Sequence, residues 1–179
     1  MPPNVQCIFL RQASPLGLGH AVLCAERVVG TEPFAVLLAD DFVTYDGHGV
    51  TADLIQAFEA SGKTQLSVME VIGRDIYKYG VVVPGGEPKS VAGLIEKPEV
   101  GKAPSNLASI GRYVLTPDIF NILRALPAGA GGEIQLADAI NTQAKGNGVE
   151  AIMLNGSRFD CGSVQGYLEA VGHVAAYRR

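Results

Sequence analysis

The stretch Phe34-Ala-Val-Leu-Leu-Ala-Asp-Asp41 decides the fold class of this chain. Its first six residues are all apolar, which is typical of a strand that is covered on both faces of a sheet. Two carboxylates follow directly. In open α/β sheets, ligands bind beyond the carboxyl ends of the strands. The stretch therefore predicts a buried strand that ends at a polar site.

Apolar runs and helical patterns alternate on both sides of this strand. Further strands are predicted at residues 5–10, 65–72, 110–115 and 151–154, with a hairpin over 81–95. Helices are predicted over 19–29, 133–144 and 163–177, after a cap at Thr51, and from Pro117 onward. Strands interleaved with helices predict an α/β, three-layer, Rossmann-like domain with a mixed, mostly parallel sheet. We expect residues 1–179 to form this one domain.

The composition excludes several classes of protein. The net charge is −4 and the 14 basic residues are scattered, so nucleic acid is not an expected partner. No apolar run approaches 18 residues, and the first four residues do not resemble a signal peptide, so no membrane association is expected. Cys7, Cys24 and Cys161 are odd in number and far apart, which favours reduced thiols in the cytoplasm over a disulfide or zinc site.

A glycine-rich turn lies between the first predicted strand and helix, at residues 11–20. Glycine lets backbone approach a flat ligand closely, because no side chain intervenes. A dinucleotide fingerprint, G-x-G-x-x-G, is disfavoured, because Gly17 and Gly19 fit but the third position is Val22. A purely structural turn stays open at this point.

Three further motifs place charges at the ends of apolar runs. Asp40 and Asp41 suit Mg²⁺, which binds one or two carboxylates together with substrate phosphates. Glu96-Lys97 offers an acceptor for sugar hydroxyls and a compact cation for a phosphate. Asp160 precedes a glycine and a predicted helix. A turn acid, an exposed ion pair and a helix cap are the respective alternatives.

Taken together and in order, these motifs resemble the sugar-nucleotide pyrophosphorylases, most closely the bacterial UTP–glucose-1-phosphate uridylyltransferases. The matching runs are R-Q-A-S-P-L-G-L-G-H-A-V at 11–22, F-A-V-L-L-A-D-D at 34–41, Y-G-V-V at 79–82, I-E-K-P at 95–98, P-S-N-L-A-S-I-G-R-Y-V-L at 104–115, G-G-E-I-Q-L-A-D-A-I at 131–140 and R-F-D-C-G-S at 158–163. The runs at 15–21 and 132–136 point to the uridylyl subgroup rather than the thymidylyl one.

The resemblance implies a role for each matching position. The implied base contacts are Gln12 and Gly17, and the implied metal ligands for Mg²⁺ are Asp40 and Asp160. The implied sugar and sugar-phosphate contacts are Gly80, Glu96, Lys97, Gly111 and Glu133. Asp40, Lys97 and Asp160 would form the catalytic set.

The implied reaction joins UTP and glucose 1-phosphate to give UDP-glucose and pyrophosphate, in a homo-oligomeric enzyme. The attacking phosphate oxygen is already ionised at neutral pH, because the second pKa of a phosphate monoester is about 6. No general base is needed, so His20, His48 and His173 are expected to be structural or exposed.

One departure from the family pattern concerns the G-x-G-T-R loop that cradles the triphosphate, which does not occur in these 179 residues. We therefore expect the N-terminal part of the domain to be missing and this chain to be an inactive or impaired fragment. The alternatives are a non-catalytic relative that binds UDP-glucose, and a pyrophosphorylase for another nucleotide or sugar, such as dTTP.

Overall fold

The computed structural model describes residues 4–45 and 47–177. Its strands are β1 Phe34–Leu37, β2 Asp41–Tyr45, β3 Thr64–Glu70, β4 Gly80–Pro84, β5 Val91–Glu96, β6 Leu107–Leu115, β7 Val149–Met153 and β8 Gly156–Asp160. Its α-helices are α1 Leu18–Cys24, α2 Glu26–Val29, α3 Val50–Ser61, α4 Ile119–Ala125, α5 Leu136–Lys145 and α6 Val164–Tyr177. Two 3₁₀ helices, η1 Gly73–Lys78 and η2 Ala130–Gly132, complete the list. None of the helices in the described ranges has the length and apolar character needed to cross a membrane.

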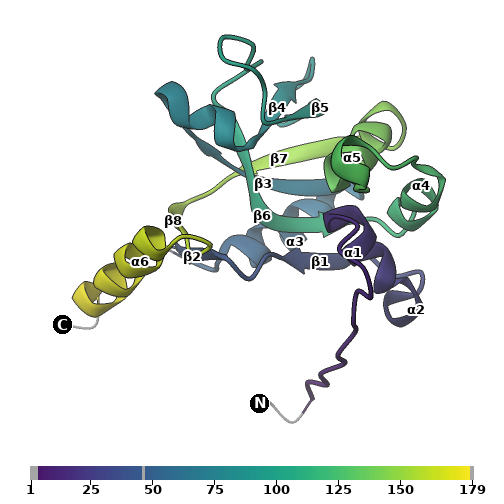
Figure 1. Cartoon of the computed structure of the whole chain (residues 1–179), viewed down its shortest axis with the longest axis horizontal. Coiled ribbons are helices and arrows are strands. Elements are labelled where there is room, and N and C mark those ends of the chain that lie inside the picture. Colours follow the sequence, from purple (N-terminus) through teal and green to yellow (C-terminus); the bar gives the residue numbers. More distant parts are fainter. Residues whose placement is uncertain (1–3, 46, 178–179) are drawn as a thin grey trace.

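A six-stranded mixed sheet forms the centre of the molecule (Figure 1). Its strand order is β5-β4-β6-β3-β7. The long strand β6 pairs with β4 at Ala108 and with β1 further along, at residues 112–115. Four of the six strands run in one direction. The strand β6 is antiparallel to its three neighbours β1, β3 and β4, and β4 is antiparallel to β5. The pair β3–β7 is parallel. The expected mixed α/β sheet is therefore confirmed, with adjacent strands more often antiparallel than expected.

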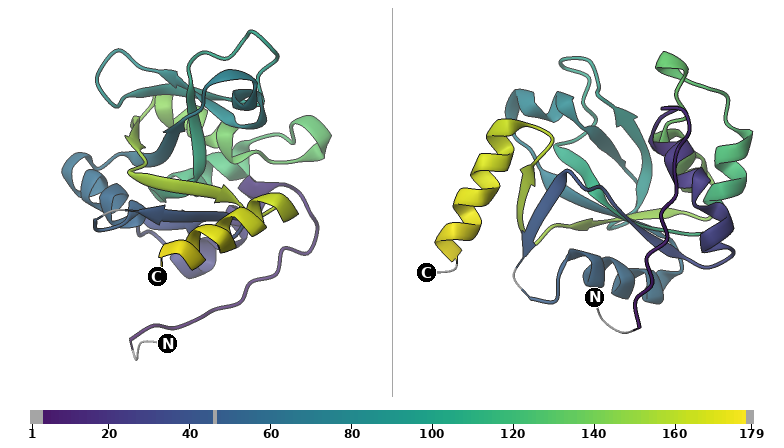
Figure 2. Two further views of the ribbon diagram at one scale, coloured as in Figure 1. Left: turned by 90° about the vertical axis from the view of Figure 1, so that its left-hand side faces the viewer. Right: turned by 60° about the horizontal axis from the view of Figure 1, so that its bottom comes forward.

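Helices cover both faces of this sheet, which gives the predicted three layers (Figures 1 and 2). On one face, Leu54 of α3 packs with Val114 of β6. On the other face, Tyr113 and Leu115 join a larger core with residues of α1, α4 and α5. Consecutive residues of β6 thus alternate between the two cores, as the period of two in a strand requires.

A small two-stranded ribbon, β2 with β8, lies beside the main sheet and was not predicted. Its register pairs Asp41 with Asp160, so two of the acidic positions meet although they are far apart in the sequence. Neither strand has a long apolar run. Residues 42–45 of β2 are of types that favour strands, but the run is short, and β8 is largely polar and carries little strand signal.

Several predictions about single elements were wrong. Residues 5–10 form no strand: their apolar side chains are exposed, and no described strand lies beside them to pair with. The strand β1 is not covered on both faces, because Leu37 is 55% exposed. The first five residues of β3 are all buried rather than alternating. Burial of these strands depends on which elements pack against them, and the local sequence pattern does not indicate that packing.

Several helix boundaries also differ from the prediction, and the helix predicted over 133–144 begins only at Leu136. Thr51 lies inside α3, which Gly49 precedes without a side-chain cap. The helix predicted from Pro117 begins at Ile119. The segment 19–29 contains two helices, α1 and α2, with Ala25 between them. The hairpin β4–β5 and the end of α5 at Gly146 are as predicted.

Candidate active site

The loop before α1 folds back on itself and carries the predicted base contacts. The side-chain nitrogen Nε2 of Gln12 donates to the carbonyl oxygen of Gly17 at 3.1 Å and lies 2.8 Å from Nδ1 of His20. Gly17 has a φ of +93°, which favours glycine, and a Cβ there would lie 2.8 Å from Cβ of Glu133. The glycine therefore lets this loop pack directly against the segment that carries Glu133.

Asp40 and Asp41 point to different places, as predicted for adjacent residues. Asp40 is exposed, whereas Asp41 is only 5% exposed. Asp40 shares its surroundings with Asp160: a Cβ built on Gly162 would lie 3.1 Å from Oδ1 of Asp160 and 3.4 Å from Oδ2 of Asp40. The two carboxylates predicted to bind the metal therefore converge beside a residue that has no side chain.

Backbone hydrogen bonds hold this carboxylate pair in place. The amide of Cys161 donates to the carbonyl oxygen of Asp40 at 2.8 Å. The amide of Gly162 donates to Oδ1 of Asp160 at 3.1 Å. The sharp turn after β8 thus holds Asp40 and Asp160 next to each other through main-chain hydrogen bonds.

This pair fits a magnesium ion. Mg²⁺ commonly takes one or two carboxylates and completes its coordination with water and substrate phosphates. No cluster of three or more His, Cys, Asp or Glu side chains that could hold a metal occurs among residues 4–45 and 47–177. A two-carboxylate site open to a phosphate is therefore the arrangement that these side chains can provide.

Asp41 has a different, structural role. Its Oδ2 accepts from the amide of Gly111 at 2.5 Å, and its Oδ1 accepts from Nε of Arg158 at 2.5 Å. Arg158 also donates to the hydroxyl of Tyr79 at 3.1 Å and lies over the ring of that tyrosine, 5.3 Å from its centroid. Asp41 and Arg158 therefore connect the β2–β8 ribbon to β6 and to the residue before Gly80.

Gly111 is buried, and the structure gives a reason for this glycine other than access to sugar. A Cβ there would lie 2.6 Å from Oδ2 of Asp41 and 2.6 Å from Cβ of Leu38. Packing within the protein thus accounts for the missing side chain. The predicted approach of Gly111 to glucose stays a prediction.

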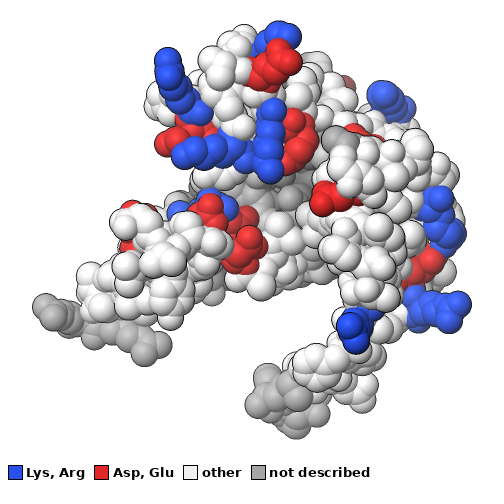
Figure 3. Space-filling model, viewed as in Figure 1, with Lys and Arg blue, Asp and Glu red and all other residues white. Residues whose placement is uncertain are grey.

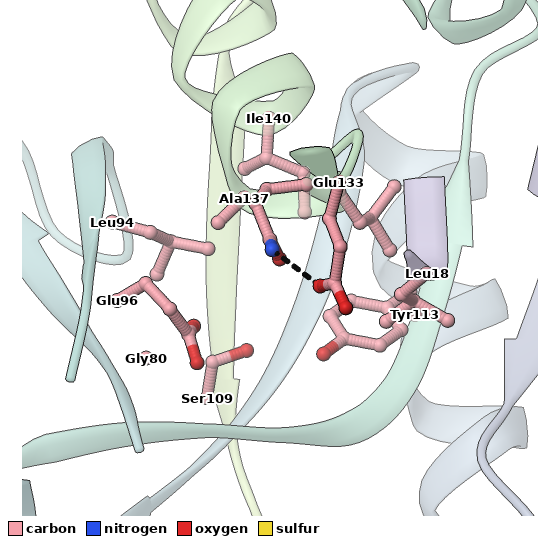
Figure 4. A pocket seen from close by; sticks show the side chains of 11 residues that line it. Leu18, Gly80, Leu94, Glu96, Ser109, Tyr113, Glu133, Ala137 and Ile140 are labelled. Carbon is pink, nitrogen blue, oxygen red and sulfur yellow. Dashed lines mark hydrogen bonds between the residues drawn. The ribbon is translucent and has the colours of Figure 1, made fainter. Parts of the chain in front are cut away.

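A pocket of about 230 Å³ brings together three of the predicted sugar contacts, Gly80, Glu96 and Glu133 (Figure 4). They come from β4, β5 and the loop before α5. The other lining residues are Leu18, Leu94, Ser109, Tyr113, Gln135, Leu136, Ala137 and Ile140. Acidic and hydroxyl side chains on an apolar wall are suited to a small ligand rich in hydroxyl groups.

The polar groups of this pocket are held as hydrogen-bonding partners. Glu133 accepts from Nε2 of Gln135 at 2.8 Å, the dashed line in Figure 4. Burial raises the pKa of Tyr113 to about 12, so its hydroxyl keeps its proton at neutral pH. Desolvation raises the pKa of Glu96, although much of this residue is exposed, and Lys97 lowers it in part. Glu96 faces Gly80, whose Cβ would lie 2.9 Å from Oε2.

Lys97 follows this pocket in a left-handed conformation, with a φ of +44°. Its amide donates to the carbonyl oxygen of Tyr79 at 3.0 Å, which fixes the main chain directly after Glu96. Its side chain is exposed. A non-glycine residue in this conformation is uncommon and is more frequent at functional sites.

The sequence missed four residues that line or support the site. Ser109, Tyr113 and Gln135 line the pocket, and Arg158 joins Asp41 to Tyr79, the residue before Gly80. All four lie within runs that carry the family resemblance, but no local pattern assigns them a contact. Figure 3 shows that this face of the molecule is hollowed at its centre, with acidic and basic side chains along the rim.

Comparison with known proteins agrees with this geometry. The family model described as nucleotidyl transferase matches residues 3–176. A protein of Pseudomonas aeruginosa named UTP–glucose-1-phosphate uridylyltransferase is 45% identical over 166 residues, which cover 90% of this chain and 60% of the relative. The protein of that name from Escherichia coli K12 is 42% identical and is covered to 59%. This chain thus spans about 60% of the length of these curated relatives.

Solved structures match equally well. A UDP-glucose pyrophosphorylase in complex with UDP-glucose has a TM-score of 0.87 and 41% identity, over 95% of this chain and 66% of that one. A UTP-bound enzyme of this kind from Acinetobacter baumannii has a TM-score of 0.87 and 42% identity, over 97% of this chain and 61% of that one. With a matching family model over nearly its whole length, the chain belongs to the nucleotidyl transferase family.

Proposed function

We propose that this chain carries the sugar and base sites of a UTP–glucose-1-phosphate uridylyltransferase. The observation that carries the proposal is the pairing of two features. Asp40 and Asp160 converge beside Gly162, and a pocket with Glu96, Gly80 and Glu133 adjoins the loop that holds Gln12. The relatives described above bear the name of this enzyme, and one was solved with UDP-glucose.

In the proposed reaction, a phosphate oxygen of glucose 1-phosphate attacks the α-phosphorus of UTP. The new P–O bond forms UDP-glucose, and the bond to the leaving pyrophosphate breaks, with both electrons staying on the pyrophosphate oxygen. The attacking oxygen is already ionised, so the chain needs to align it and to balance charge. Bound at Asp40 and Asp160, Mg²⁺ would neutralise the phosphates and orient them.

The residues of the chain have separable tasks in this proposal. Glu96 accepts hydrogen bonds from the glucose hydroxyls, and Gly80 leaves room for the sugar beside that carboxylate. Lys97 offers a compact positive charge to the sugar phosphate. Gln12 and Gly17 meet the edge of the uracil ring. Gly111 and Glu133 remain proposed sugar contacts, with Glu133 facing the pocket.

Two coarser features of the protein complete the proposal. The three cysteines are odd in number and far apart in the sequence, which favours reduced thiols over a disulfide framework, so we place the protein in the cytoplasm. We also propose that it works as a homo-oligomer, as the resemblance implies. Light scattering on the purified chain measures its oligomeric state directly.

Ligand binding by the 179-residue chain tests the proposal. Calorimetry with UDP-glucose is expected to give saturable binding, and CDP-glucose and ADP-glucose are expected to bind more weakly. The Lys97→Ala variant should lose affinity for glucose 1-phosphate, by about tenfold for one charge-assisted contact, and keep its affinity for UTP.

Lys97→Arg should restore only part of this loss, because the planar guanidinium replaces a compact ammonium. Lys102→Ala is the matched control, since Lys102 is exposed and pairs with Glu99 on the surface. A Lys97→Ala variant that loses affinity for UTP alone would show that the assigned role is wrong.

A further inference from the structure

The amide of Gln12 has a defined orientation, because one of its neighbours can only accept. A carbonyl oxygen carries no hydrogen, so the amide atom that lies 3.1 Å from the oxygen of Gly17 must be Nε2. The same carbonyl also accepts from the amide of Ala21 at 3.1 Å, inside the first turn of α1. The first turn of α1 therefore holds the carbonyl oxygen of Gly17 in place, and this oxygen requires the nitrogen of the Gln12 amide to face it.

The second hydrogen of this amide points to His20. Nε2 of Gln12 lies 2.8 Å from Nδ1 of the imidazole, and only an unprotonated Nδ1 can accept from it. The thiol of Cys24, another donor, lies 3.9 Å from the same nitrogen. Since the amide nitrogen of Gln12 is a donor, Nδ1 is the acceptor in this contact, which assigns the ring hydrogen to Nε2.

Both amide hydrogens of Gln12 are thus engaged within the protein, by Gly17 and by His20. The oxygen Oε1 makes no hydrogen bond with the residues that the structure describes. At Gly17 the same loop packs on Glu133, which lines the pocket, so Gln12 belongs to a loop that adjoins the candidate site. Gln12 can therefore offer a ligand an acceptor but no donor.

We propose that His20 is a positioning residue that fixes Gln12 as an acceptor and thereby selects the nucleotide base. This inference rests on the proposed function. Uracil has a hydrogen on N3 and can donate it to Oε1, whereas cytosine has a lone pair at N3 and meets Oε1 as a second acceptor. Thymine shares the N3 hydrogen, so His20 separates uracil and thymine from cytosine and does not separate them from each other.

Two variants of equal shape test this role. Leucine and asparagine both place an atom where histidine has Nδ1: a methyl group in leucine and the acceptor Oδ1 in asparagine. The quantity to compare is the ratio of the dissociation constants of CDP-glucose and UDP-glucose, measured by calorimetry. His20→Leu is expected to lower this ratio by about tenfold, because the amide loses one of its two fixed partners. His20→Asn should keep the ratio within about threefold of the unmodified chain.

The outcomes separate this inference from the proposed function. If the unmodified chain does not prefer UDP-glucose, the proposed function fails and the selectivity argument fails with it. If the chain prefers UDP-glucose but the Leu and Asn variants change the ratio equally, or not at all, the role of His20 is overturned. A loss of affinity for both ligands by the same factor in His20→Leu would also overturn it, because a merely structural contact predicts that result.

Nitrogen NMR of the histidine ring provides a readout that needs no ligand. In the unmodified chain at neutral pH, the Nδ1 resonance of His20 should be that of an unprotonated nitrogen, and the Nε2 resonance that of a protonated one. Gln12→Leu removes the donor and should shift the Nδ1 resonance. A histidine protonated at Nδ1 would contradict the inference whatever the binding data show.

Discussion

At the scale of single residues, the site depends on carboxylates that are held in different surroundings. Asp40 is exposed beside Asp160, Asp41 is buried against Arg158, and Glu96 is partly desolvated in the sugar pocket. Three acids that look alike in the sequence thus lie in three different surroundings, which suit the proposed metal binding, a structural ion pair and the proposed ligand contact. The surroundings, rather than the residue type, divide the tasks.

The metal prediction concerns Asp40 and Asp160. In the unmodified chain, Mg²⁺ should strengthen the binding of UDP-glucose, because these acids would hold the ion and its charge would offset that of the ligand phosphates. Asp40→Asn and Asp160→Asn should each reduce that gain by about tenfold or more, since each removes a charged ligand with little change in volume. Calorimetry at several Mg²⁺ concentrations measures the gain.

Asp75→Asn is the control for both variants, because Asp75 is an exposed partner of Lys78 on η1. Its binding curve should follow that of the unmodified chain at every Mg²⁺ concentration. Melting temperatures of the three variants should stay close to one another. A full Mg²⁺ effect in both site variants would rule out the proposed metal ligands.

A pH prediction follows from the raised pKa of Glu96. The folded chain binds a proton at this carboxyl more readily than the unfolded chain, whose value is the ordinary 4.5. Its contribution to stability is therefore fully present below 4.5 and is lost as the pH rises through the raised folded value. Glu96→Gln removes the partly desolvated charge, so it should raise the melting temperature at pH 7 and have less effect at pH 4.

Thermal unfolding of both chains across this pH range provides the measurement. The difference between Glu96→Gln and the unmodified chain should grow from pH 4 to pH 7. Glu87→Gln, at an exposed residue near the β4–β5 turn, serves as a control and should show no such growth. A difference that shrinks with rising pH would mean that Glu96 is stabilised in its charged form.

At the scale of elements, the β2–β8 ribbon depends on one buried ion pair. The side chains of Arg158 and Asp41 are 11% and 6% exposed, and the pair joins the ribbon to Gly111 of β6. Arg158→Met should lower the free energy of unfolding by about 3–5 kcal/mol, because it leaves Asp41 buried without a partner charge. Denaturant unfolding measures this loss.

A second variant and an exposed pair control that experiment. Adding Asp41→Asn to Arg158→Met should recover part of the loss, because the uncompensated charge disappears. Lys102→Met breaks the exposed pair with Glu99 and should cost less than about 1 kcal/mol. Equal losses for the buried and the exposed pair would contradict the role assigned to Arg158.

The elements also show how far the sequence could be used. The hairpin β4–β5 and the helices α3, α5 and α6 follow from periodicity and turn residues, which are local signals. The ribbon β2–β8 was not predicted, because its strands are short, β8 is largely polar, and the two become neighbours only in the folded chain. The exposed face of β1 was missed for a similar reason: an apolar run does not reveal which neighbours cover it.

The site shows the same division between local and distant signals. The strand-end motifs placed Glu96, Asp40 and Asp160 in the sequence, and the resemblance gave their expected roles. Their convergence depends on the pairing of β2 with β8 and on the turn at Gly162, which no local pattern contains. For Gly111, the structure offers contacts with Leu38 and Asp41 that the sequence could not suggest.

At the scale of the whole molecule, the rate of the proposed reaction depends on the groups that can balance the charge of UTP. The described site offers the Asp40–Asp160 pair for one metal ion and Lys97 for the sugar phosphate. The G-x-G-T-R loop, which the family resemblance assigns to the triphosphate, does not occur in the 179 residues. The loss of a single well-placed donor at developing charge can lower kcat by about 10²–10³.

The 179-residue chain by itself should therefore bind UDP-glucose but form it from UTP and glucose 1-phosphate at least about 10²-fold more slowly than the longer relatives. Calorimetry with UDP-glucose measures the binding, and a coupled pyrophosphate assay on the same preparation measures the rate of the reaction. Asp160→Asn supplies the background rate for the assay. Turnover equal to that of a longer relative would contradict the prediction, because the charge on the leaving pyrophosphate would then be balanced by groups of this chain that the proposed site does not include. Since the proposed function assigns binding to Glu96, Gly80 and the Gln12 loop, a slow chain that still binds UDP-glucose would separate ligand recognition from charge neutralisation within one fold.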